Sequence, residues 1–109
     1  MSFDPLPSIN VPEIELFGQF YTSQSPVQAW GTVRGREFYF RSRHEHWDFA
    51  VSETPDVDPG DIFPDDNRAR MFVREGPYGQ GKFAASYMPL DVAAQIIERC
   101  AQEYAQTLA

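Results

Sequence analysis

Apolar and polar residues alternate along most of the chain up to residue 87, with the period of two that half-buried β-strands show. The alternation predicts six strands, at residues 13–21, 28–33, 36–43, 47–51, 68–75 and 82–87. Most of the joining segments are short and rich in turn residues, such as Gly35, which favours antiparallel hairpins. In the strand at 68–75, the pattern sets Met71 and Val73 on the buried face and Phe72 on the opposite face.

The end of the chain has the period of an amphipathic helix instead. Pro89 and Asp91 suit its first turn. One apolar stripe follows, formed by Val92, Ile96, Ile97, Cys100, Tyr104 and Leu108. The pattern predicts an α+β fold: an antiparallel β-meander of five to six strands with one C-terminal α-helix packed on one face. Residues 13–109 are expected to form this single domain, and the proline-rich residues 1–12 an extended N-terminal arm.

The segment from residue 52 to residue 67 combines prolines, a glycine and many carboxylates, with no basic residue. Its acidic residues are Glu53, Asp56, Asp58, Asp61, Asp65 and Asp66. A loop is expected here, and loops of this length are usually functional or mobile. The spacing of its central aspartates resembles that of calcium ligands, but Asn67 stands where an EF-hand loop needs glutamate, and Gly60 precedes the third aspartate. The default expectation is therefore a solvated acidic loop.

The net charge of −7 limits the partners that the chain can attract. Such a chain is not expected to bind nucleic acid directly or to adsorb to an anionic membrane, whereas basic surfaces attract it.

Cys100 is the sole cysteine, so no internal disulfide forms, which fits a reducing compartment. The first residues carry neither the basic region nor the apolar run of a signal peptide. A cytoplasmic location is therefore expected.

No motif for catalysis or cofactor binding is complete in the sequence. Gly76, Gly81 and Lys82 match the first seven positions of a phosphate-binding P-loop, but Phe83 stands where the motif needs Ser or Thr. A glycine-rich hairpin is the preferred interpretation, with Tyr78 at its tip, available to a partner. Cys100 lies on the apolar stripe of the helix, which favours a buried thiol over a nucleophile. We therefore expect no enzymatic activity, no catalytic residue and no cofactor.

His44 and His46 lie two residues apart in a predicted turn, with Asp48 close by, and suggest a metal site as an alternative to a polar hairpin. A catalytic zinc ion normally has three protein ligands, and the chain has no further histidine. Carboxylates are available as a third ligand, but nothing in the sequence positions one. No metal site is predicted, and the role of the two histidines is left open.

Four of the nine basic residues lie within ten positions of one another: Arg34, Arg36, Arg41 and Arg43. Because acidic residues are in excess over the whole chain, these arginines are expected to form ion pairs with the acidic loop. The alternative is a basic patch on an acidic protein, which would suit an acidic partner.

Compact size, acidity and an acidic loop together resemble the anti-CRISPR proteins, small inhibitors encoded by bacteriophages and mobile elements. The stretches at residues 30–33 (Trp-Gly-Thr-Val) and 38–41 (Phe-Tyr-Phe-Arg) are similar in style to bacterial and phage sequences. The resemblance implies a non-enzymatic inhibitor that blocks a basic nucleic-acid-binding surface of a host protein or nucleoprotein complex. The acidic loop from Glu53 to Asp66 would carry this interaction by imitating a row of phosphates.

The alternative function is a protein–protein interaction or homodimerisation module. It would use aromatic residues on the second face of the sheet, namely Phe17, Tyr21, Tyr39 and Phe72. These residues alternate with the predicted core set, so they face outward if only one side of the sheet is covered. A third hypothesis, a metal-dependent enzyme, rests on His44 and His46.

Overall fold

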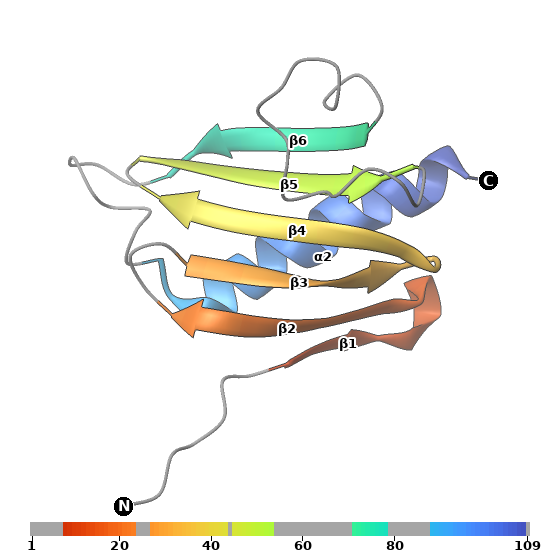
Figure 1. Cartoon of the computed structure of the whole chain (residues 1–109), viewed down its shortest axis with the longest axis horizontal. Helices are drawn as coiled ribbons and strands as arrows, with labels where there is room; N and C mark the ends of the chain where they lie inside the picture. Colours follow the sequence, from red (N-terminus) through yellow and green to blue (C-terminus); the bar gives the residue numbers. More distant parts are fainter. Residues whose placement is uncertain (1–7, 24–26, 44, 54–70, 79–87, 109) are drawn as a thin grey trace, which may run out of the picture.

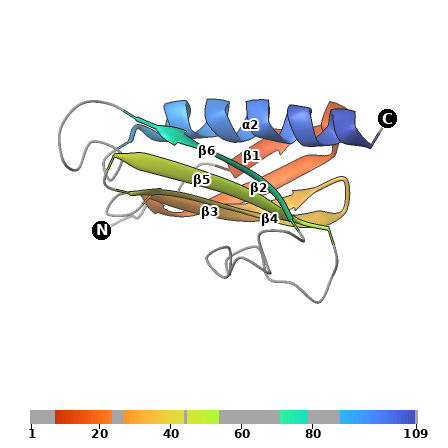
Figure 2. The same ribbon diagram turned by 90° about the horizontal axis from the view of Figure 1, so that it is seen from above.

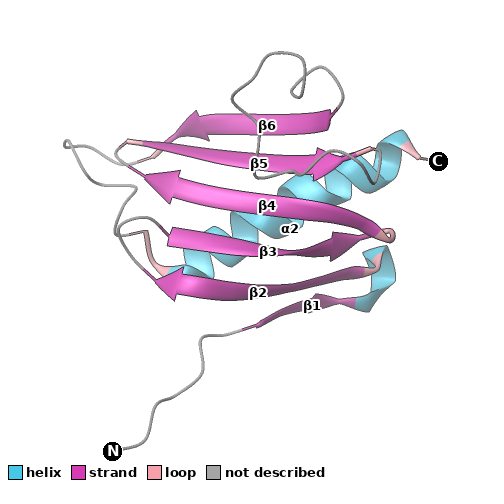
Figure 3. Ribbon diagram, viewed as in Figure 1, coloured by secondary structure: helices cyan, strands magenta, loops and turns pink. Residues whose placement is uncertain are grey.

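The computed structural model describes residues 8–23, 27–43, 45–53, 71–78 and 88–108 (Figures 1 and 3). Their elements are β1 (Ser8–Val11), the short 3₁₀ helix η1 (Pro12–Ile14), β2 (Leu16–Ser23), β3 (Val27–Val33), β4 (Arg36–Arg43), β5 (His46–Ser52), β6 (Met71–Pro77) and α2 (Leu90–Thr107). The strands form one sheet in the order β1-β2-β3-β4-β5-β6, and every neighbouring pair is antiparallel. Helix α2 crosses one face of this sheet (Figure 2), so the predicted α+β meander with a covering helix is confirmed.

The expected N-terminal arm needs a correction, because residues 8–11 are a strand of the sheet. Ile9 lies opposite Gly18 of β2 and its side chain is buried in the core. The four residues Ser8–Val11 do alternate, but such a short run beside prolines carries little signal in the sequence. Residues 1–7 and the predicted strand at 82–87 lie outside the described residues.

The core lies between the sheet and α2, and large aromatic side chains from the central strands fill most of it. Phe38 and Phe40 of β4 face Val51 and Phe49 of β5, and all four are fully buried. The rings of Phe38 and Phe49 stack with their centroids 5.5 Å apart. Burial of such rings is the main source of stability in a domain of this size.

Helix α2 contributes its own buried stripe to this core: Ala93, Ile97, Cys100, Ala101, Tyr104 and Ala105. The predicted members Ile97, Cys100 and Tyr104 are confirmed, whereas Leu108 is exposed. The alanines were not predicted, because their small side chains give a weak hydrophobic signal. They let the helix backbone approach the aromatic layer closely. Among the residues that the structure describes, no helix has both the length and the apolar character needed to cross a membrane.

The face assigned to Phe72 was wrong. Phe72 lies opposite Val51 on the side covered by the helix, and its ring centroid is 5.2 Å from that of Tyr104. Arg74 shares this face: its guanidinium carbon lies 4.1 Å above the Phe72 ring, and its Nε is 2.9 Å from Glu103 Oε2. Both faces of β6 carry apolar residues, so alternation alone could not fix which face is inside. Phe72 is therefore a core residue and no partner-binding residue.

The hairpin between β3 and β4 is as tight as the sequence predicts. Its two turn residues, Arg34 and Gly35, have φ values of 53° and 78°. Positive φ at both positions is typical of a type I′ turn, whose twist matches that of the strands. Arg34 also pairs with Glu15 at the end of η1, with Nη1 and Oε2 3.1 Å apart.

Candidate functional site

The face of the sheet opposite α2 carries a row of aromatic side chains, which we call the aromatic strip: Phe17, Tyr21, Trp30 and Tyr39. Phe17, Tyr21 and Trp30 are 47%, 42% and 54% exposed, and Tyr39 is half-buried. The ring centroids of Tyr21 and Trp30 are 5.1 Å apart, and those of Trp30 and Tyr39 are 6.4 Å apart. Tyr21, Trp30 and Tyr39 therefore form a connected aromatic surface across β2, β3 and β4, and Phe17 lies on the same face.

Strand register explains how the strip assembles. Trp30 lies directly opposite Tyr39, and Phe17 lies opposite Thr32 on the same face. The register of β2 against β3 shifts between Phe20 and Thr22, so Tyr21 sits at a bulge. Bulges often redirect a side chain. Here the Tyr21 hydroxyl donates a hydrogen bond to the side-chain carbonyl of Gln28.

The predicted positions of Phe17, Tyr21 and Tyr39 on the face away from the helix are confirmed. Trp30 was missed, although it is the most exposed ring of the strip. The signal was present in the sequence, because Ala29 and Val33 share the inward phase of β3 and Trp30 has the opposite phase. A tryptophan is normally assigned to the core on hydrophobicity, and that expectation obscured the phase.

The Tyr39 phenol stays protonated to a higher pH than an ordinary tyrosine. Burial raises the pKa of the Tyr39 phenol to about 12, and the hydrogen bond with Tyr21 adds to the shift. The Arg41 guanidinium lowers this pKa and the Asp48 carboxylate raises it. Both charged groups thus lie near the ring, and the strip is bordered by ionic residues on β4 and β5.

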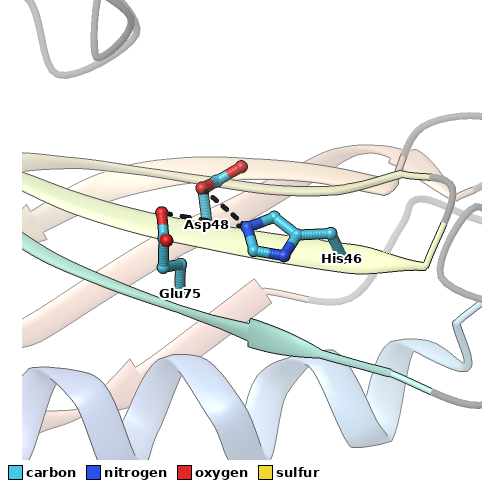
Figure 4. A group of neighbouring side chains, drawn as sticks. All are labelled: His46, Asp48 and Glu75. Atoms are coloured by element: carbon cyan, nitrogen blue, oxygen red, sulfur yellow. Dashed lines mark ion pairs between the residues drawn. The ribbon is translucent and has the colours of Figure 1, made fainter.

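Beside the strip lies the polar cluster, which consists of His46, Asp48 and Glu75 (Figure 4). His46 Nε2 is 3.3 Å from Asp48 Oδ1 and 3.8 Å from Glu75 Oε2. The side chains of His46 and Glu75 are about half exposed, whereas Asp48 is only 8% exposed. The three side chains come from the first half of β5 and from β6, and they point toward one another.

The antiparallel register brings the polar cluster together. Asp48 lies directly opposite Glu75 of β6 on one side and opposite Arg41 of β4 on the other. His46 lies two residues before Asp48, so it shares the same face of β5. The sequence places His46 close to Asp48, but it does not reveal that Glu75 joins them. Glu75 reaches them through the pairing of β5 with β6, which joins segments far apart in the chain. His44 lies outside the described residues.

The surroundings of Asp48 disfavour the charged form of its carboxyl group. Burial raises the pKa of its carboxyl above the ordinary value, and Glu75 raises it further, while His46 and Arg41 lower it. Since the pKa in the folded state lies above that in the unfolded state, the native protein binds this proton more tightly. The contribution of Asp48 to the free energy of unfolding therefore decreases as the pH rises through the raised pKa.

This leads to a prediction for Asp48→Asn. As the pH falls from about 7 to about 4, across the range in which carboxyl groups titrate, the stability difference should shift in favour of the wild type. The measurement is urea denaturation of both proteins at each pH. A difference that stays flat, or that shifts toward the variant in acid, would contradict the raised pKa.

The remaining predicted site residues are distributed as follows. Glu53 is exposed at the end of β5, and Asp56, Asp58, Asp61, Asp65 and Asp66 lie outside the described residues. Tyr78 directly follows β6 and is partly buried: it packs against the core, and its amide donates to the Glu45 carbonyl at 2.9 Å. The rest of its predicted loop lies outside the described residues, so a contact of Tyr78 with a partner stays a prediction. Cys100 is buried, as expected, and burial raises the pKa of its thiol to about 11. A thiol in this state is a poor nucleophile.

The arginine group is divided between the two faces and the turn. Arg34 pairs with Glu15, and Arg41 borders the strip beside Asp48. Residues 54–70 of the acidic loop lie outside the described residues, so ion pairs between the arginines and this part of the loop stay a prediction.

Comparisons with protein-family models, with curated proteins and with solved structures found no match to this chain. A functional conclusion therefore depends on the residues and the geometry of the chain itself.

Proposed function

We propose that this protein is a non-enzymatic binding protein whose aromatic strip docks on a basic surface of a partner protein. The observation that carries the proposal is the strip itself: three rings that are 42% to 54% exposed share one face of a chain with a net charge of −7, and two of them, Tyr21 and Trp30, have ring centroids 5.1 Å apart. Single exposed apolar residues are ordinary on a protein surface, but a contiguous aromatic row marks an interaction site.

The residue types of the strip suit tight binding. Tryptophan and tyrosine dominate the binding energy of protein interfaces, because their rings bury a large area and lose little conformational entropy. The rings stand on paired central strands, so they are held in place before a partner arrives. Preorganisation of this kind reduces the entropic cost of binding.

Charge decides which partner fits best. Arginine and lysine side chains stack on exposed aromatic faces through cation–π contacts, and the net charge of −7 attracts them over a longer range. Aromatic rings on a sheet also stack nucleic-acid bases in other proteins. Here the net charge of −7 would repel phosphates, which makes a nucleic acid a poor occupant of the strip. A second copy of the chain would bring another net charge of −7, so a basic protein is the preferred occupant.

The inhibitor hypothesis is a specific form of this proposal. If the partner's basic surface normally holds nucleic acid, an acidic protein docked there would displace it, as the resemblance to anti-CRISPR proteins implies. The acidic segment from Glu53 to Asp66 would add to the attraction. All but the first of its carboxylates lie outside the described residues, so this form is supported by the sequence alone.

The test is an NMR titration of the ¹⁵N-labelled full chain with an arginine-rich peptide, with an acidic peptide of equal length as the ligand control. We expect saturable shifts at β2, β3 and β4. Trp30→Ala should weaken binding at least ten-fold, since a central aromatic contact contributes about 2 kcal/mol or more. The matched control is Leu108→Ala, which removes an exposed apolar side chain at the far end of α2 and should leave binding unchanged.

Three outcomes would contradict the proposal. The first is an affinity that Trp30→Ala leaves unchanged. The second is binding that disappears completely at high salt, which would show charge attraction without a contribution from the rings. The third is a stable dimer in sedimentation that Trp30→Ala dissociates, which would assign the strip to a second copy of the chain.

A further inference from the structure

We infer that the polar cluster of His46, Asp48 and Glu75 is a binding site for a divalent transition-metal ion of the zinc type. This inference goes beyond the docking proposal and does not depend on it. It concerns three side chains from two strands, whose ligand atoms all lie within 4.8 Å of one another. Figure 4 shows them turned toward a common point above the sheet.

The donor atoms lie close to the spacing of ligands around one metal ion, and the Glu75 carboxylate would have to move a little nearer to reach it. Donors bound at about 2.1 Å lie about 3.0 Å apart at a right angle and about 3.4 Å apart in a tetrahedron. His46 Nε2 is 3.3 Å from Asp48 Oδ1 and 3.8 Å from Glu75 Oε2. Small changes in the side-chain torsion of Glu75, which is half exposed, would complete the set.

The two carboxylates converge on one nitrogen. Asp48 and Glu75 both approach His46 Nε2, so one ion placed between them would reach all three donors. Asp48 and Glu75 are also directly opposite across β5 and β6, where like charges destabilise a strand pair. A divalent cation bound between them would neutralise this repulsion and bind all three donors together.

The burial of Asp48 points in the same direction. It is 8% exposed, and a carboxylate in that position needs a nearby positive charge. Arg41 on the neighbouring strand supplies part of this charge, and a bound metal ion would supply more. His46 and Glu75 are half exposed, so water or a partner's side chain has room to complete the coordination.

The donor set selects the class of metal. One imidazole nitrogen with two carboxylates suits zinc and its neighbours in the first transition series, whereas calcium and magnesium prefer sites made only of oxygen. Zinc sites with three protein ligands keep a fourth coordination position open for water. The inference concerns binding only, and no reaction is assigned to the site.

The experiment is a titration of the tag-free full chain with ZnCl₂, after removal of metals by a chelator, in competition with a chromophoric zinc indicator. We expect one saturable site, and a rise in melting temperature with zinc but not with magnesium. His46→Gln and Glu75→Gln should each weaken zinc binding at least ten-fold. Removal of a residue that only hydrogen-bonds to a metal ligand already costs about ten-fold or more in affinity, and these two residues are ligands themselves. Both positions are half exposed, so the variants are expected to fold, which circular dichroism checks.

Glu45→Gln is the matched control, because it makes the same chemical change as Glu75→Gln at an exposed position outside the polar cluster. It should bind zinc as the wild type does. No saturable zinc binding by the wild type would overturn the inference and leave the polar cluster as an ion pair. Binding that survives in both cluster variants would also overturn it, since the ion would then lie elsewhere on the chain.

Discussion

Replacement of Phe38 by alanine is expected to lower the free energy of unfolding by about 3–5 kcal/mol, the usual cost of deleting a fully buried aromatic ring. Phe38 is fully buried in the core between the sheet and α2, and its ring stacks on Phe49. It also covers Gly18, where an added Cβ would lie 2.7 Å from the Phe38 ring. Since a domain of this size is stable by about 5–15 kcal/mol in total, the loss should be visible as a large drop in melting temperature.

Phe17→Ala is the control, because it makes the same chemical change on the other face of the sheet. Phe17 is about half exposed, so the loss of stability should be within about 1 kcal/mol. Urea denaturation of the two variants and the wild type measures both effects. Equal losses in the two variants would contradict the assignment of a buried and an open face.

Gly31→Ala is the second change with a large expected effect, at about 3 kcal/mol or more. A Cβ at Gly31 would lie 2.0 Å from the carbonyl oxygen of Phe17 and 2.5 Å from the Cα of Gly18. Gly31 and Gly18 are direct partners in β3 and β2, so the obstacle is backbone, which cannot move aside as a side chain does. The methyl group would force the two strands apart at the point where the aromatic strip is built.

Gly35→Ala separates this effect from the general cost of replacing a glycine. Gly35 has a φ of 78°, but nothing lies within 4 Å of an added Cβ, so only the conformational cost of about 1 kcal/mol is expected. Denaturation curves of both variants give the comparison. If Gly31→Ala were no more costly than Gly35→Ala, the close approach of β2 and β3 would not be a constraint on stability.

The sequence predicted the strands from β2 to β6 and the helix well, because each has its own periodic pattern, whereas β1 is too short to show one. The predictions failed where two segments had to be matched over a distance. The face of Phe72 could not be fixed, since β6 is apolar on both sides and only its pairing with β5 decides the phase. The same pairing brings Glu75 to Asp48, so the third member of the polar cluster was not identified from the sequence.

Trp30 illustrates a different failure. Its phase in β3 was readable, but a large apolar residue is assigned to the core by default. The structure places it on the open face, and the proposed function depends on that position. The phase of an aromatic residue in its strand therefore predicts exposure better than its hydrophobicity does, as Trp30 shows.

The strand order has a consequence for how the chain reaches this structure. Because the sheet follows the order of the chain, each pairing from β1 through β5 joins neighbours across a few residues. The entropy lost on closing a loop increases with its length, so these hairpins form at nearly the lowest cost that a sheet allows. The β5–β6 pairing, between Ser52 and Met71, closes a longer stretch of chain. Among the strand pairs that the structure describes, it is the one with the largest loop-closure cost, and it also completes the polar cluster.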